Sequence, residues 1–187
     1  MISTSDFKRG VTVEVDGTLY RIEDVHHVKT KKSAVYRVKL RDLRAGHIIE
    51  RTFNAGDRLT AARVETRPMQ YLYAQDDRHV FMNTETYEQI EIQAALIADV
   101  LPYIKEGALA QVATYGEEPL GVEVGPAVEL KVEQSEPGLR GDTQSGATKP
   151  ATMETGLVVN VPLFINVGDT IKIGTADGNY IERIANP

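Results

Sequence analysis

Apolar residues in this chain recur at every second position, and that period most constrains how the chain can fold. The segments 11–15 and 34–40 alternate apolar with polar residues, and the first of them stops at Asp16-Gly17, a dipeptide typical of a hairpin turn. Helical stripes of apolar residues are scarce, and we expect a helix only over residues 94–104. The pattern therefore predicts an all-β fold.

Turn signals separate the expected strands into three groups, residues 1–66, 67–128 and 129–187. The first group predicts a small, strongly twisted antiparallel barrel. The second and third groups each predict a short five-stranded barrel of the OB type. We therefore expect three small β-barrels in series, with one short helix in the middle barrel.

Composition excludes several classes of protein. Hydrophobic residues make up 42% and charged residues 26% of the 187, which is typical of globular proteins and not of disordered or fibrous ones. Cysteine is absent, so disulfides and thiolate chemistry are excluded. No run of about 18 apolar residues is present, and no apolar segment follows a basic start. We expect a cytoplasmic protein with no membrane partner.

Charge is unevenly distributed along the chain, whose formal net charge is -6. Residues 1–66 contain 13 Lys and Arg against 9 Asp and Glu, a net charge of +4. Residues 67–128 contain 3 basic and 10 acidic residues, a net charge of -7. Residues 129–187 contain 5 basic and 8 acidic residues, a net charge of -3. One basic end on an acidic chain favours a protein that presents that end to a polyanion.

Catalytic motifs are weak. The four histidines, His26, His27, His47 and His79, do not have the spacing of metal ligands on a helix. The sequence contains neither a phosphate-binding P-loop nor the nucleophile elbow of hydrolases. We therefore expect no metal, no cofactor and no enzymatic activity.

The segment Lys29-Thr30-Lys31-Lys32-Ser33 lies between two expected strands. Pairing Val28 with Val35 places Lys31 and Lys32 at the tip of a tight hairpin. Two ammonium groups at a tip repel each other and bury nothing, so they contribute little to folding. An ordinary exposed turn is one interpretation, and a cationic finger aimed at phosphates, or a modified side chain, is the other.

The strand after this hairpin carries Arg37, Lys39 and Arg41 on one face, about 6–7 Å apart. Like charges on one face of a strand repel each other. A solvated strand surface is one interpretation of this face, and a polyanion that meets it is the one we favour.

The third group, residues 129–187, contains a long and specific sequence signature. It consists of Lys149-Pro150-Ala151, Gly156, Val159, Val161-Pro162, Ile165 and Gly168. Shorter stretches support it, such as Met69-Gln70-Tyr71-Leu72-Tyr73. In these residues the chain resembles bacterial elongation factor P over essentially its whole length.

This resemblance implies an L-shaped fold, with an N-terminal SH3-like (KOW-type) barrel followed by two OB-fold barrels. It implies a translation elongation factor that binds the 70S ribosome between the peptidyl and exit sites and stimulates peptide-bond formation at consecutive prolines. The implied partners are peptidyl-tRNA, ribosomal RNA and mRNA, and we expect a monomer.

The resemblance also implies functional residues. Lys29, Arg37, Lys39 and Arg41 would contact tRNA or rRNA phosphates, and the tip lysine would approach the acceptor end of the peptidyl-tRNA. The composition of Gly141-Asp142-Thr143 alone predicts an ordinary turn. The resemblance implies that these residues would lie near mRNA in the exit site. The C-terminal contacts with tRNA or the small subunit would be Tyr180 and Arg183.

The hairpin tip departs from the family pattern. The family usually has Pro-Gly-Lys-Gly there, and many members extend the lysine post-translationally with a modifying enzyme. Here the loop is Thr30-Lys31-Lys32-Ser33, one residue shorter and without glycine. Counting from the N-terminal side gives Lys32 as the tip lysine, which we favour, and counting back from Ala34 gives Lys31. A divergent paralogue that binds the ribosome or RNA without rescuing proline stalls is the alternative function.

Overall fold

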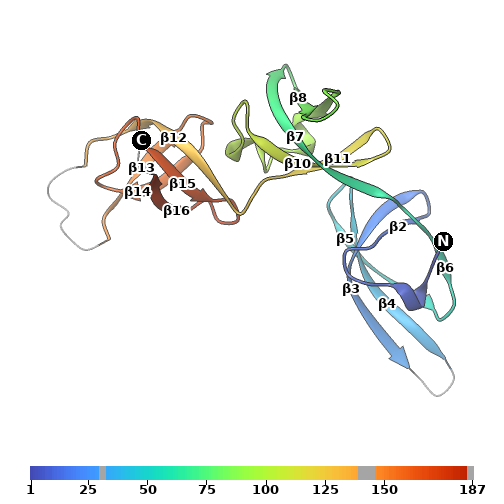
Figure 1. Cartoon of the computed structure of the whole chain (residues 1–187). Coiled ribbons are helices and arrows are strands. Elements are labelled where there is room, and N and C mark those ends of the chain that lie inside the picture. Colours follow the sequence, from blue (N-terminus) through green and yellow to red (C-terminus); the bar gives the residue numbers. More distant parts are fainter. Residues whose placement is uncertain (30–32, 139–145, 185–187) are drawn as a thin grey trace. The chain divides into compact units, whose positions relative to one another are not determined.

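The computed structural model describes residues 1–29, 33–138 and 146–184, and these are almost entirely β (Figure 1). The strands form three sheets, one of six strands and two of five. The chain divides into two compact units, residues 1–66 with 113–121 and residues 67–112 with 122–187. The predicted all-β class of three small barrels is confirmed. Among the described residues, no helix is long and apolar enough to cross a membrane.

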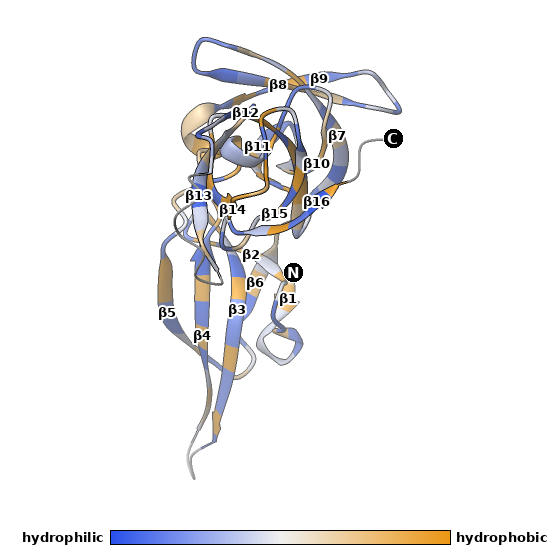
Figure 2. Cartoon of the chain, turned by 90° about the vertical axis from the view of Figure 1, so that its left-hand side faces the viewer, coloured by the Kyte–Doolittle hydropathy of each residue, from blue (hydrophilic) through white to orange (hydrophobic). Residues whose placement is uncertain are grey.

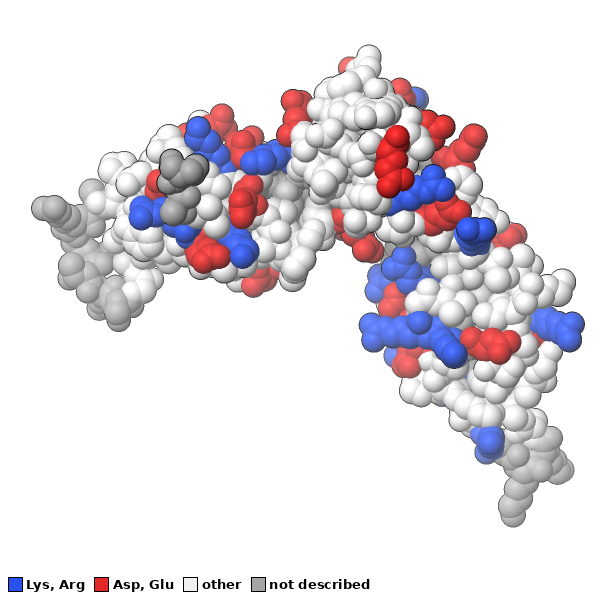
Figure 3. Space-filling view, viewed as in Figure 1, with Lys and Arg blue, Asp and Glu red and all other residues white. Residues whose placement is uncertain are grey.

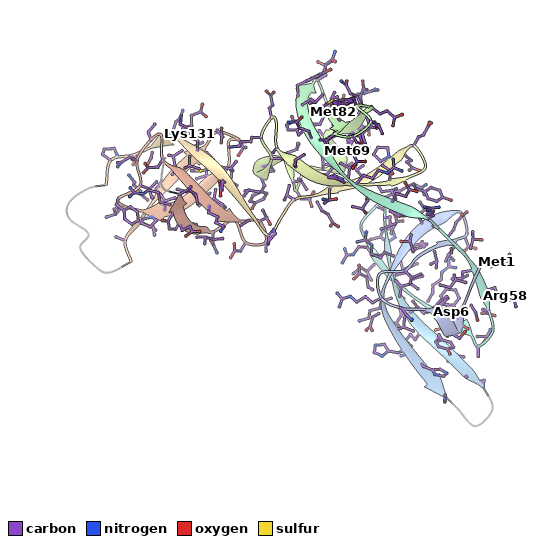
Figure 4. All side chains as sticks on the ribbon, in the orientation of Figure 1. Met1, Asp6, Arg58, Met69, Met82 and Lys131 are labelled. Carbon is purple, nitrogen blue, oxygen red and sulfur yellow. The ribbon has the colours of Figure 1, made fainter. Side chains whose placement is uncertain are left out.

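The first sheet has the strand order β1-β6-β2-β3-β4-β5. Its elements are β1 (Ile2–Ser3), the 3-10 turn η1 (Thr4–Asp6), β2 (Thr12–Val15), β3 (Thr18–Lys29), β4 (Ala34–Asp42), β5 (Ile48–Asn54) and β6 (Arg58–Ala61). Strand β1 pairs with β6 in the register Ser3 to Arg58, at the edge where Figure 4 labels Arg58. The expected turn at Asp16-Gly17 joins β2 to β3, and both residues have positive φ, 53° and 78°. That type I′ geometry matches the twist of the flanking strands.

Strands β3 and β4 are the longest strands of this sheet and pair from Tyr20–Asp42 to Lys29–Ala34, with one register shift between Ile22 and Asp24 (Figure 2). Their hydrophobic and hydrophilic residues alternate in bands, as the period-two pattern requires. Val28 lies opposite Val35 and Lys29 opposite Ala34, so the predicted register of the hairpin is confirmed. Ile22, Val38 and Leu40 are fully buried and anchor the base of the hairpin in the first core.

The second sheet has the order β11-β10-β7-β8-β9. Its strands are β7 (Val64–Gln75), β8 (Arg78–Asn83), β9 (Gln89–Gln93), β10 (Leu109–Tyr115) and β11 (Glu118–Glu123). Strand β7 runs straight through Arg67-Pro68, where we expected the second barrel to begin. Met69 and Met82, on the neighbouring strands β7 and β8, are labelled in Figure 4.

The continuous helix expected over residues 94–104 is replaced by two single 3-10 turns, η2 (Ala94–Leu96) and η3 (Leu101–Tyr103). Pro102 contributes to the break, because in a continuous helix it has no N–H to donate to the carbonyl four residues earlier and its ring would clash with that carbonyl. In the structure Pro102 lies in the first turn of η3, where no such bond is required. The apolar residues of this segment still pack inward, and Ile97 is fully buried in the second core.

The third sheet has the order β14-β13-β12-β15-β16. Its strands are β12 (Ala127–Ser135), β13 (Thr148–Met153), β14 (Val158–Pro162), β15 (Thr170–Gly174) and β16 (Tyr180–Ile184). Within the second unit, the Thr155 hydroxyl donates a 2.6 Å hydrogen bond to the Pro102 carbonyl. Lys105 also pairs with Glu154 at 3.3 Å. These contacts join the turn after β13 to the η3 segment.

Candidate nucleic-acid interface

The outer half of the β3–β4 hairpin is exposed. Burial along β3 ends at Ile22, which is 0% exposed, and residues 26–29 are all exposed. The described part of the hairpin is therefore not folded back onto its own barrel. Lys31 and Lys32, the two candidates for the tip lysine, lie outside the described residues.

The outward face of β4 carries Arg37, Lys39 and Arg41, which alternate with the buried Val38 and Leu40. The predicted common face is therefore confirmed. The expected repulsion among three unpaired like charges is wrong, because two of the three cations have acidic partners on neighbouring strands. Arg37 pairs with Glu50 at 3.3 Å and Arg41 with Glu23 at 2.8 Å. Of the three cations on this face, Lys39 is the one with no acidic partner among the described residues.

Two lysines of the hairpin remain without a partner among the described residues. Lys29 ends β3, and Lys39 lies on the outward face of β4 opposite Glu50, and both are exposed. Basic side chains show on the surface of the first barrel in Figure 3, with acidic side chains among them. The described cations available to phosphates on this hairpin are therefore chiefly Lys29 and Lys39.

The sequence reasoning missed an aromatic pair on the other face of the hairpin. His27 and Tyr36 are cross-strand partners, and their rings are parallel with centroids 4.4 Å apart. The Tyr36 ring also meets Phe7 edge-on at 6.5 Å, and Phe7 meets the buried Phe53 at 5.6 Å. The Val28–Val35 register already implied that His27 and Tyr36 face each other, so the signal was present in the sequence.

The predicted exit-site loop, Gly141-Asp142-Thr143, lies outside the described residues. The structure describes the two ends of this loop. The buried Lys149 donates a 2.8 Å hydrogen bond from Nζ to the Glu136 carbonyl. A Cβ on Gly138 would lie 3.2 Å from Leu163, so a larger residue there would require Leu163 to shift by a few tenths of an ångström. The chain is therefore held closely on the N-terminal side of the loop.

Tyr180 and Arg183, the predicted C-terminal contacts, both lie on β16 but in different settings. Tyr180 is half-buried against the third core. Arg183 is exposed, with its guanidinium 5.6 Å from the centre of the Phe164 ring and 3.9 Å from Asp169. Arg183 is thus the more accessible of the two. Phe164, 58% exposed, is an aromatic neighbour that the sequence reasoning did not select.

Titratable groups also meet in a cleft of about 510 Å³ within the second unit, lined in part by Tyr71, His79, Lys105 and Glu154. Tyr71 Oη and His79 Nδ1 lie 2.9 Å apart. Burial raises the pKa of Tyr71 and lowers the pKa of His79, so both are neutral near pH 7. Lys105 and Glu154 form an ion pair at 3.3 Å in the same cleft. Among the described residues, no group of three histidines or carboxylates could hold a metal ion.

Three family models match the chain in order. They are the elongation factor P KOW-like domain at residues 3–59, the elongation factor P OB domain at residues 64–122 and the elongation factor P C-terminal domain at residues 128–183. Together they span all three sheets.

Two solved structures are similar in fold. One is eukaryotic translation initiation factor 5A from Methanococcus jannaschii, with 20% identity and a TM-score of 0.52, covering 66% of this chain and 95% of that one. The other is a translation initiation factor eif-5a family protein from Naegleria fowleri, with 15% identity and a TM-score of 0.51, covering 66% of this chain and 96% of that one.

Proposed function

The chain belongs to the elongation factor P family, and we propose on this basis that it binds the ribosome between the peptidyl and exit sites and speeds peptide-bond formation at consecutive prolines. It would act in the cytoplasm, with peptidyl-tRNA, ribosomal RNA and mRNA as partners. Family membership already makes it a translation factor; the site of binding and the effect on prolines are the proposal.

One observation carries the proposal. The hairpin that bears Lys31 and Lys32 extends beyond the first core, and residues 26–29 are exposed although they are paired throughout with β4. A paired but exposed hairpin contributes little apolar burial to its own barrel. It is suited to enter a site on another molecule and present its tip there.

The expected mechanism is positioning. Proline has a fixed φ and a secondary amine, and a chain ending in prolines holds its reacting groups poorly aligned. Bracing the peptidyl-tRNA restores the alignment, and alignment alone supplies a large part of the rate of a bimolecular step. The ribosome supplies the chemistry. Lys29 and Lys39, with Arg37 and Arg41, would contact phosphates, which fix position without reading sequence.

The test is reconstituted translation of two messages that differ only in a run of three prolines. Added protein is expected to relieve the stall on the proline message and to leave the other message unchanged. Ribosome binding without relief would replace this proposal with the divergent paralogue, for which the short, glycine-free loop is the motivating feature. Absence of both binding and relief would contradict both functions.

A further inference from the structure

We propose that the His27–Tyr36 pair is a stacking platform for one unpaired RNA base. The inference deepens the proposed function and rests on it for the source of the RNA. The platform lies on the inward face of the β3–β4 hairpin, on the opposite side from Arg37 and Lys39.

The two rings are preorganised. They stand directly opposite each other in the ladder, with planes within 1° of parallel. Tyr36 is held in turn by its edge-on contact with Phe7, which packs on Phe53 in the first core. A row of four rings therefore runs from the buried core to the exposed hairpin. Rings fixed in this way lose little conformational entropy when a ligand stacks on them.

The last ring of the row has an unused face. His27 is exposed, and its only ring contact, hydrogen bond or ion pair among the described residues is the stack on Tyr36. The stack on Tyr36 covers one face of the His27 ring. A parallel pair that ends in solvent has the geometry in which proteins stack unpaired bases on histidine and tyrosine.

A cation lies beside this face. Lys29 follows His27 by two positions, so both side chains point to the same side, about 6–7 Å apart. Lys29 is exposed and has no acidic partner among the described residues. A base on His27 would place its phosphate within reach of the Lys29 ammonium. The combination of a stacking ring with a neighbouring unpaired cation matches a nucleotide and does not match an apolar peptide.

The absence of tryptophan from the chain makes a direct test possible. His27→Trp introduces a single tryptophan on the platform, and Val28→Trp places one on the opposite face of the same strand as the matched control. A hexameric adenosine oligoribonucleotide at low salt is expected to quench the fluorescence of Trp at position 27 and not at position 28. An abasic hexamer, which keeps the phosphates, is expected to leave both unquenched.

Affinity gives the second readout. His27→Ala is expected to weaken binding of a labelled hexamer about tenfold, measured by anisotropy, and His27→Phe to restore it. Transfer RNA with its unpaired 3′ nucleotides intact is expected to quench the fluorescence of Trp at position 27. Transfer RNA from which these nucleotides have been removed is expected not to quench it, and this difference identifies the source of the base.

Equal quenching at positions 27 and 28, quenching by the abasic hexamer, or no quenching at all would overturn the proposal. If His27→Ala impairs proline rescue while hexamer affinity is unchanged, the pair only stiffens the hairpin; the inference then fails and the proposed function stands. If RNA quenches the fluorescence at position 27 but the wild-type protein does not relieve proline stalls, the stacking platform is supported and the proposed function is contradicted.

Discussion

The Lys149 ammonium donates a 2.8 Å hydrogen bond to the backbone carbonyl of Glu136 across the base of the loop that contains Gly141-Asp142-Thr143. Lys149 is only 7% exposed and points to the core side of β13, like Ala151 and Met153. This contact gives the first residue of the family signature a physical role, because it holds one end of the predicted exit-site loop.

Replacing Lys149 by methionine is expected to destabilise the protein by about 1.5–3 kcal/mol, because it keeps the apolar stem and removes a charge-assisted hydrogen bond from a buried side chain to the Glu136 carbonyl. Urea unfolding measures this loss. Lys172→Met is the control, since Lys172 pairs with Glu182 at the surface and its loss is expected to cost less than about 1 kcal/mol. Equal losses for the two variants would mean that the Glu136 contact is unimportant.

The turn after β4 predicts a pH dependence. Asp42 accepts hydrogen bonds from the backbone N–H groups of Arg44 at 2.7 Å and Ala45 at 2.8 Å. Burial acts to raise the pKa of Asp42, but these two bonds and nearby positive charge outweigh it and hold the pKa below the ordinary value of 3.8. The carboxylate therefore favours the folded state. Its contribution is complete above pH 3.8 and is lost as the pH falls through the lower folded-state pKa.

Asp42→Asn is expected to keep both bonds to the turn and to lose this pH dependence, whereas Asp42→Ala loses about 1–3 kcal/mol near pH 7 as well. Thermal unfolding from pH 2 to pH 7 separates the two effects. A wild-type protein and an Asp42→Asn variant with parallel stability curves over that range would contradict the assignment.

Breaking the ion pair between Arg37 and Glu50 is expected to raise the affinity of the protein for the ribosome. Glu50→Gln frees the Arg37 guanidinium and removes the negative charge opposite Lys39. We expect ribosome affinity at low salt to rise by up to about fivefold and the advantage to shrink as salt is added. Filter binding over a salt series measures both. Glu91→Gln, which frees Arg78 in the second barrel, is the matched control and is expected to change little. A loss of affinity in Glu50→Gln would show that the pair itself orders the binding surface.

Much of the fold could be predicted because the period of the sequence is strict. The turn at Asp16-Gly17 and the register of Val28 with Val35 follow from local alternation and turn chemistry, and both are confirmed. Residues 94–104 could not be predicted in the same way. Their apolar spacing suits a helix. Pro102, together with the burial of apolar side chains of this segment in the second core, favours two short 3-10 turns instead.

The site was harder to predict because its electrostatics depend on pairing between neighbouring strands. The alternation placed Arg37 and Arg41 on one face of β4. Their acidic partners lie on the neighbouring strands, Glu50 on β5 and Glu23 on β3. Predicting these ion pairs requires the registers between strands, and the pattern within a single strand does not supply them. The stack of His27 on Tyr36 could have been found from the predicted register alone.

The most direct test of the central claim is the rate of peptide-bond formation between consecutive prolines, measured by rapid quench with ribosomes saturated by wild-type protein or by the Lys31→Ala/Lys32→Ala double variant. Lys131→Ala, at an exposed position of β12 labelled in Figure 4, is the control. If the hairpin tip positions the peptidyl-tRNA, the double variant loses at least about tenfold in rate at equal ribosome occupancy, while the control keeps the wild-type rate. Equal rates for all three proteins at full occupancy would contradict the account.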